Sequence, residues 1–365
     1  MTAATLPTAL LDDLKLALAS CPQAVTPDDA LALLDGLCGA PDSGLAADRT
    51  LWSRLFAPTP DLLAALDAAR ARLAAPAEPA LTVRDRVPAL RAEMQRQGLD
   101  GFVIPHGDEH QSEFIPAASA RLAWLTGFSG SAGIAIVLAE QAAIFVDGRY
   151  TLQVRDQVDT DVFATLHLTE QPPAEWIEAH LPNGAALGID PWLHSADAVE
   201  RFENAAKKAG GQITLVERNP VDAIWSDRPA RPLAPVIPHP DRFAGETSEA
   251  KRQRLAESLD AESVAAAILT QPDSVAWLLN IRGGDTAHTP LPLSFALLNR
   301  DGRVDLFCDG RKLLPETRQH LGNGVRVQAL EALGPALEAL GTAEACVLAD
   351  RQSTPAWVLN RLSAA

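Results

Sequence analysis

Short apolar runs separated by helical patterns constrain the fold of this chain more than any other feature. Four such runs contain no charged residue, at 101–104, 133–138, 142–146 and 186–189. Runs of this length without polar alternation are typical of strands covered on both faces. Helical patterns occupy 151–158, 173–181 and 195–209. Strands interleaved with helices predict an α/β fold, a sheet layered with helices.

The same texture returns after about residue 246 and repeats the first region. The segment Ile144–Tyr150, which contains Asp-Gly-Arg, is echoed by Leu306–Arg311, which contains the same triplet. Asp190, followed by a helical pattern, is echoed by Asp350. Each pair is separated by about 160 residues. Matching order and spacing predict two similar domains in tandem.

Composition sets the expected domain bounds. Residues 1–80 are rich in Ala and Leu and carry helix-start signals, so they predict a small helical N-terminal extension. The two α/β domains are expected at 84–227 and 246–365. The segment 228–245 between them has five prolines within 228–240, which predicts an extended, semi-rigid linker.

Charge and cysteine usage narrow the classes of function. The net charge is −16, which makes a general nucleic-acid binder improbable on electrostatic grounds. No stretch of eighteen apolar residues predicts a membrane span, and the first residues do not resemble a signal peptide, so we expect a cytoplasmic protein. The four cysteines form no CxxC pair, which favours free thiols over a zinc site: Cys21, Cys38, Cys308 and Cys346.

The segment His106–Glu113 concentrates two histidines and three carboxylates. On a helix, His106 and His110 would share a face and could hold zinc, with Glu113 nearby. Pro105 and Gly107 instead favour a loop anchored by polar side-chain hydrogen bonds. Both interpretations remain open from the sequence, with the loop favoured.

Three further segments have a structural and a functional interpretation. The glycines of Gly127–Gly133 could cradle a phosphate, but the strand pattern that follows favours a tight turn that leads from one strand into the next. Asp147-Gly-Arg-Tyr150 ends a predicted strand, where its arginine either reaches a ligand carboxylate or pairs with the aspartate. Asn280–Pro290 is a loop that either faces a ligand or is a hydrogen-bonded turn or domain contact.

These segments together resemble the N-terminal part of the Xaa-Pro aminopeptidase (aminopeptidase P) family in its long, three-domain form. The resemblance rests on Ile104–Ile115, Leu125–Gly133, Asp147–Tyr150, Asn219–Pro229 and Trp277–Asp285 with Pro290, which occur in family order over about 84–365. It implies two creatinase-like domains, each a mixed sheet with flanking helices. Residues 1–80 match no part of the family pattern.

The resemblance also implies a homodimer and a catalytic domain that this chain is expected to lack. In the family, a pita-bread domain binds two manganese ions and removes an N-terminal residue that precedes proline. The chain ends where that domain is expected to begin, so we assign no catalytic residue, no metal ligand and no cofactor to it. Arg149 corresponds to a family arginine that contacts the peptide in the partner subunit's active site.

Two functions remain open. The chain is either a non-catalytic portion of an Xaa-Pro aminopeptidase, a truncated or split form that supplies dimerisation and substrate-access surfaces, or a free-standing binding or regulatory protein that kept this scaffold without peptidase activity. Proline-containing peptides are the expected ligands if a catalytic domain is present. Neither function involves nucleic acid or a membrane.

Overall fold

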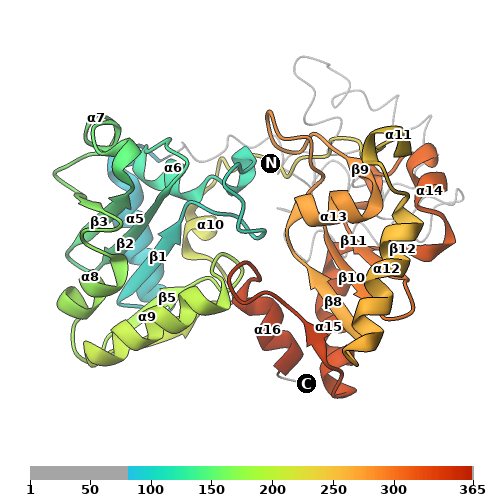
Figure 1. The fold of residues 1–365 in the computed structure, drawn as a ribbon. Coiled ribbons are helices and arrows are strands. Elements are labelled where there is room, and N and C mark those ends of the chain that lie inside the picture. Colours follow the sequence, from blue (N-terminus) through green and yellow to red (C-terminus); the bar gives the residue numbers. More distant parts are fainter. Residues whose placement is uncertain (1–80, 364–365) are drawn as a thin grey trace, which may run out of the picture. The chain divides into compact units, whose positions relative to one another are not determined.

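The computed structural model describes residues 81–363 (Figure 1). The helical extension predicted over 1–80, with Cys21 and Cys38, lies outside the described residues. The segments 81–225 and 231–363 belong to one compact unit. Among residues 81–363, no helix combines the length and the apolar character required to span a bilayer.

The first half of this unit is built on a six-stranded mixed sheet with the strand order β4-β3-β2-β1-β5-β6. Strand β2 pairs antiparallel with both β1 and β3. The outer pairs are parallel: β4 with β3, β5 with β1, and β6 with β5. The strands are β1 (Gly101–Pro105), β2 (Gly133–Leu138), β3 (Ala142–Val146), β4 (Ala164–His167), β5 (Ala186–Ile189) and β6 (Gln212–Leu215).

Helices cover both faces of this sheet, which explains why its central strands are apolar throughout. On β1, Phe102 and Ile104 join a core that includes Leu90 of α5 and Trp225, which follows α10. Val103, between them, points to the opposite core with residues of α8 and α9. The helices are α5 (Val83–Arg96), α6 (Arg121–Thr126), α7 (Gln153–Gln157), α8 (Pro173–His180), α9 (Ala196–Lys208) and α10 (Pro220–Ile224), and a 3-10 turn, η3, spans Ala117–Ser119.

The second half repeats this topology on a five-stranded sheet with the order β12-β11-β10-β8-β13. The β8–β10 and β10–β11 pairs are antiparallel and the β11–β12 and β8–β13 pairs parallel, as in their counterparts in the first sheet. The strands are β8 (Ala266–Leu269), β10 (Phe295–Asn299), β11 (Val304–Phe307), β12 (Val325–Gln328) and β13 (Val347–Leu348). The prediction of two similar α/β folds in tandem is confirmed.

Helices again flank this sheet. Leu259 and Val275 belong to the core on one face, and Leu337 and Val358 to the core on the other. The elements are α12 (Ser248–Ala261), α13 (Pro272–Leu279), α14 (Pro315–Leu321), α15 (Leu333–Thr342) and α16 (Ala356–Ser363), with 3-10 turns η5 (Gly310–Lys312), η6 (Gly322–Gly324) and η7 (Leu330–Ala332).

The later part of the proline-rich segment, from Val236 onward, contacts the second half. Strand β7 (Ile237–Pro238) pairs with β9 (Ile281–Arg282), and a short helix, α11, spans Asp241–Ala244. Val236 is 1% exposed, and its backbone N–H donates to the Lys312 carbonyl at 2.9 Å. Packing of this kind holds an extended segment in one conformation even though proline contributes no N–H.

Candidate functional site

Strand β3 ends in a turn that fixes the position of Arg149. The Asp147 carboxylate accepts the backbone N–H of Arg149 at 2.9 Å and caps the 3-10 turn η4 (Gly148–Tyr150). The guanidinium of Arg149 folds back onto the same carboxylate, with Nε 3.2 Å from Oδ1 and Nη2 2.7 Å from Oδ2. This bidentate geometry is the strong form of an arginine–carboxylate pair. The hydrogen bonds from Arg149 lower the pKa of Asp147, which is therefore ionised at neutral pH.

A second carboxylate and two hydroxyl groups surround this turn. Arg149 Nη1 lies 4.0 Å from Glu113 Oε1, and the guanidinium carbon lies 5.2 Å from the centroid of the Tyr150 ring. Ser131 Oγ is 2.9 Å from both Glu113 Oε1 and the Tyr150 hydroxyl. The Arg149 side chain remains 61% exposed. The result is a positioned cation on the surface with exposed N–H groups, suited to contacting an acceptor on another molecule.

The His106–Glu113 segment is a loop, as the favoured interpretation predicted. Asp108 Oδ1 accepts the backbone N–H groups of His110 at 3.0 Å and Ser112 at 3.1 Å. His106 Nε2 lies 2.8 Å from the Glu113 carbonyl, whereas His110 Nδ1 lies 2.8 Å from the Thr270 carbonyl. The two histidines have separate partners and do not share a helix face, so the zinc interpretation has no geometric support.

A buried arginine anchors the same loop. Arg121 is 3% exposed and donates to both oxygens of Asp222, at 2.7 and 3.0 Å, and to Glu109 Oε1 at 3.0 Å. Burial raises the pKa of Glu109, but the charge of Arg121 outweighs burial, and the net pKa is lowered to about 2. Arg121 thus joins Glu109 of the loop to Asp222 of α10 through charge-assisted hydrogen bonds.

The Gly127–Gly133 segment is a tight connection and not a phosphate cradle. Gly127 ends α6 in the left-handed region with φ of 83°, and β2 follows at Gly133. The turn therefore joins a helix to a strand, where a strand-to-strand turn was expected. A Cβ on Gly130 would lie 2.3 Å from the Phe128 ring and 2.9 Å from the Tyr150 ring, so glycine permits this close approach.

The Asn280–Pro290 loop is held by internal hydrogen bonds. Asn280 is buried and accepts from Lys251 Nζ at 2.7 Å, and its amide donates to Asp241 Oδ1 at 3.1 Å. The Asp285 carboxylate is buried and receives the Lys312 ammonium. Asn280 and Asp285 are therefore engaged inside the protein, as the hydrogen-bonded-turn interpretation requires.

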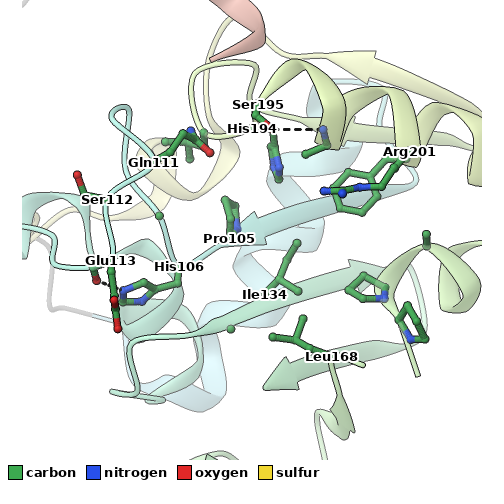
Figure 2. Close-up of a pocket in the computed structure, with 18 of the residues that line it drawn as sticks. Pro105, His106, Gln111, Ser112, Glu113, Ile134, Leu168, His194, Ser195 and Arg201 are labelled. Atoms are coloured by element: carbon green, nitrogen blue, oxygen red, sulfur yellow. Dashed lines mark hydrogen bonds between the residues drawn. The ribbon is translucent and has the colours of Figure 1, made fainter. Parts of the chain in front are cut away.

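A pocket of about 650 Å³ lies in the first half of the unit, at a place that no sequence motif indicates. Figure 2 shows His106, Ser112 and Glu113 on one side of it and His194, Ser195 and Arg201 on the other. The second group follows β5 and begins α9. The only sequence signal for that group was Ser195 at the start of a predicted helix.

Within residues 81–363, no three His, Cys, Asp or Glu side chains are grouped so that they could hold a metal ion. The described residues therefore do not fit the dimanganese site that the family resemblance implies. Cys308 is buried and Cys346 exposed, and both are free thiols, as predicted. Burial raises the pKa of Cys308 to about 11.

Comparison with known proteins agrees with this fold. Two family models, each described as a creatinase/prolidase N-terminal domain, match residues 86–219 and 227–365. An X-prolyl aminopeptidase from Caenorhabditis elegans, described as a cytosolic enzyme with a di-nuclear active site, superimposes with a TM-score of 0.72 at 27% identity. That match covers 76% of this chain and 48% of the nematode chain.

Proteins with similar sequences are also described as Xaa-Pro aminopeptidases. A probable Xaa-Pro aminopeptidase P from Penicillium rubens is 35% identical over 266 residues, which cover 72% of this chain and 43% of the relative. One from Paracoccidioides brasiliensis is 36% identical over 259 residues, covering 70% and 42%. The chain thus spans less than half the length of these relatives. It belongs to the Xaa-Pro aminopeptidase (aminopeptidase P) family, of which it carries two creatinase/prolidase N-terminal domains.

Proposed function

We propose that this chain supplies the non-catalytic, substrate-access and subunit-contact surfaces of an Xaa-Pro aminopeptidase. The reaction it would serve is the manganese-dependent removal of an N-terminal residue that precedes proline. In this proposal the hydrolytic centre and its metal ions belong to a part of the enzyme outside the described residues. The two N-terminal domains then restrict access to the centre and hold two subunits together, in a cytoplasmic homodimer.

The observation that carries the proposal is the exposed guanidinium of Arg149, held in one direction by Asp147. A free arginine side chain samples many rotamers, and ordering it on binding reduces affinity. The bidentate contact at 2.7 and 3.2 Å orders it in advance. Because Asp147 neutralises part of the charge, Arg149 is suited to a neutral acceptor such as a peptide carbonyl as well as to a carboxylate. We assign it the role of contacting the peptide across the subunit interface.

The first test is an assay of the purified 365-residue chain with manganese and an Arg-Pro-Pro peptide. We expect no release of arginine. Release that stops on addition of a chelator would place a metal centre in this chain and overturn the proposal.

A second test provides the catalytic part. In a hybrid protein, this chain replaces the matching N-terminal half of the Caenorhabditis elegans enzyme. We expect the hybrid to release arginine from the peptide in the presence of manganese, and sedimentation velocity to show a dimer. A folded, monomeric and inactive hybrid would contradict the assigned role and favour the free-standing binding protein.

A further inference from the structure

The pocket of about 650 Å³ has features of a small-molecule site that the proposed function does not use. Its volume lies in the range of ligand pockets, and apolar side chains form much of its wall. Figure 2 shows Ile134 and Leu168 on this wall, and Phe202 of α9 also lines it. All lining residues belong to the first domain, and Arg149 is not among them, so the pocket is distinct from the arginine surface.

Arg201 is the cation of this pocket, whose lining includes no lysine and no other arginine. The side chain is exposed and forms no hydrogen bond, ion pair or ring contact in the part of the chain that the structure describes. Figure 2 shows its guanidinium group directed from α9 toward the middle of the pocket. The parallel N–H groups of a guanidinium match the two oxygens of a carboxylate.

Glu113 is the one acidic side chain among the lining residues, and it lies on the opposite side of the pocket. Its charge already has partners, because Arg149 Nη1 lies 4.0 Å from Oε1 and the Ser131 hydroxyl donates to the same oxygen at 2.9 Å. The Glu113 carboxylate is thus partly neutralised, whereas Arg201 is not. The uncompensated charge of the pocket is therefore positive, which favours an anionic ligand group.

The lining also limits how polar a ligand can be. A single guanidinium neutralises a monoanion, whereas a dianion such as phosphate would leave uncompensated charge beside an apolar wall. His194 lines the pocket as well, but its Nε2 atom is fully buried without a hydrogen-bond partner among residues 81–363, so it offers no contact to a ligand. The lining therefore favours a ligand with one carboxylate on an otherwise apolar body.

We propose that this pocket binds a small apolar monocarboxylate, an aryl- or alkyl-carboxylic acid without an amino group. The carboxylate forms a bidentate contact with Arg201, and the apolar body lies against Ile134, Leu168 and Phe202. Such a ligand has no peptide bond, so the pocket is a binding site separate from peptide hydrolysis. The inference does not rest on the proposed function, because it follows from the pocket's own residues.

The test is a titration of the 365-residue chain with phenylacetate, followed by ligand-observed NMR. We expect saturable binding in the millimolar range or tighter, which weakens roughly tenfold or more in Arg201→Gln. Arg218→Gln is the matched control, because Arg218 is exposed and does not line the pocket. Its affinity for phenylacetate is expected to equal that of the unmodified chain. Arg201 is exposed, so its replacement should leave folding unchanged, which circular dichroism checks.

A second variant tests the pocket without removing the charge. Ala198 is half-buried on α9 and lines the pocket, and leucine is also a good helix former. Ala198→Leu therefore narrows the cavity while Arg201 stays in place. We expect this variant to lose saturable binding of phenylacetate with an unchanged circular dichroism spectrum.

An uncharged probe assigns the carboxylate contact. Phenylacetamide has the same apolar body without the carboxylate, and we expect it to bind roughly tenfold more weakly than phenylacetate and to be insensitive to Arg201→Gln. Three outcomes would overturn the proposal. They are absence of saturable binding of phenylacetate, equal affinities of Arg201→Gln and Arg218→Gln for it, and equal affinities of the unmodified chain for the acid and the amide.

Discussion

The Lys312 ammonium meets the Asp285 carboxylate in the interior of the second domain, where the two side chains are 3% and 0% exposed. Lys312 Nζ also donates to the Leu293 carbonyl at 3.1 Å, and the Leu293 N–H donates to Asp285 Oδ2 at 2.7 Å. The pair therefore connects η5 to the loop before β10. It occupies the turn that corresponds to the Arg149 turn of the first domain, so the two copies use similar turns differently.

Replacement of one partner of this pair should destabilise the protein strongly. Lys312→Met leaves the Asp285 carboxylate buried without a counter-charge, and we expect the free energy of unfolding to fall by about 3–5 kcal/mol. Urea denaturation followed by circular dichroism measures it. The double variant Asp285→Leu/Lys312→Met should recover much of the loss. Arg303→Met, at an exposed pair with Asp301, is the control. If Lys312→Met and Arg303→Met lower the free energy of unfolding by the same amount, burial of the ion pair does not explain the loss.

The sequence predicted the strands of the first domain well because their burial is two-sided. The runs at 133–138, 142–146 and 186–189 coincide with β2, β3 and β5. Strands β4 and β6 at the edges of the sheet were missed because their side chains are largely half-exposed, as in Ala164–His167, and carry no continuous apolar signal. The tandem repeat was recognisable because the Asp-Gly-Arg turn needs the same capping aspartate in both copies.

The pocket could not be predicted in the same way. His194 follows β5, whereas Pro105 ends β1 and Glu113 lies in the loop beyond it, and only the parallel pairing of β1 with β5 brings these segments together. A lone histidine before a helix carries no signal of a missing hydrogen-bond partner. That property depends on burial, which the folded chain alone defines.

His194 should make stability depend on pH. In the unfolded chain a histidine has a pKa of about 6.5, whereas burial lowers the pKa of His194 to about 4 in the folded protein. As the pH falls from 7 to 4 the unfolded state takes up a proton that the folded state does not, so stability is lost across this window, by about 3 kcal/mol in total.

The measurement compares the free energy of unfolding of the protein and of His194→Phe between pH 7 and pH 4. Carboxylates such as Glu109 contribute equally to the pH dependence of the two proteins. The difference between their free energies of unfolding therefore reports the contribution of His194 alone. The variant should show the shallower dependence on pH. Identical slopes would mean that the ring is protonated inside the folded protein.

Gly130 should tolerate no side chain, for steric reasons. An alanine Cβ would lie 2.3 Å from Phe128, whose ring is buried, so the ring must move within a packed core. We expect Gly130→Ala to cost about 1–3 kcal/mol of stability. Gly148→Ala is the matched control, because its Cβ would meet only His167 Nε2 at an ordinary 3.5 Å. Thermal denaturation measures the melting temperatures of the two variants, and we expect that of Gly130→Ala to be the lower. Equal melting temperatures would show that the turn relaxes without cost.

The two Asp-Gly-Arg turns permit a matched test of Arg149. Arg311 Nη2 lies 2.7 Å from Asp309 Oδ2, as Arg149 Nη2 does from Asp147 Oδ2, and the two arginine side chains are similarly exposed. In the active hybrid enzyme, Arg149→Gln should lower kcat/KM for the Arg-Pro-Pro peptide by roughly 10- to 100-fold, because a charged hydrogen bond to the peptide is lost. Arg311→Gln should leave it within about twofold. Neither substitution should change the melting temperature, since both ion pairs are on the surface. If both variants lose activity equally, the turn matters for folding of the hybrid and Arg149 does not contact the peptide.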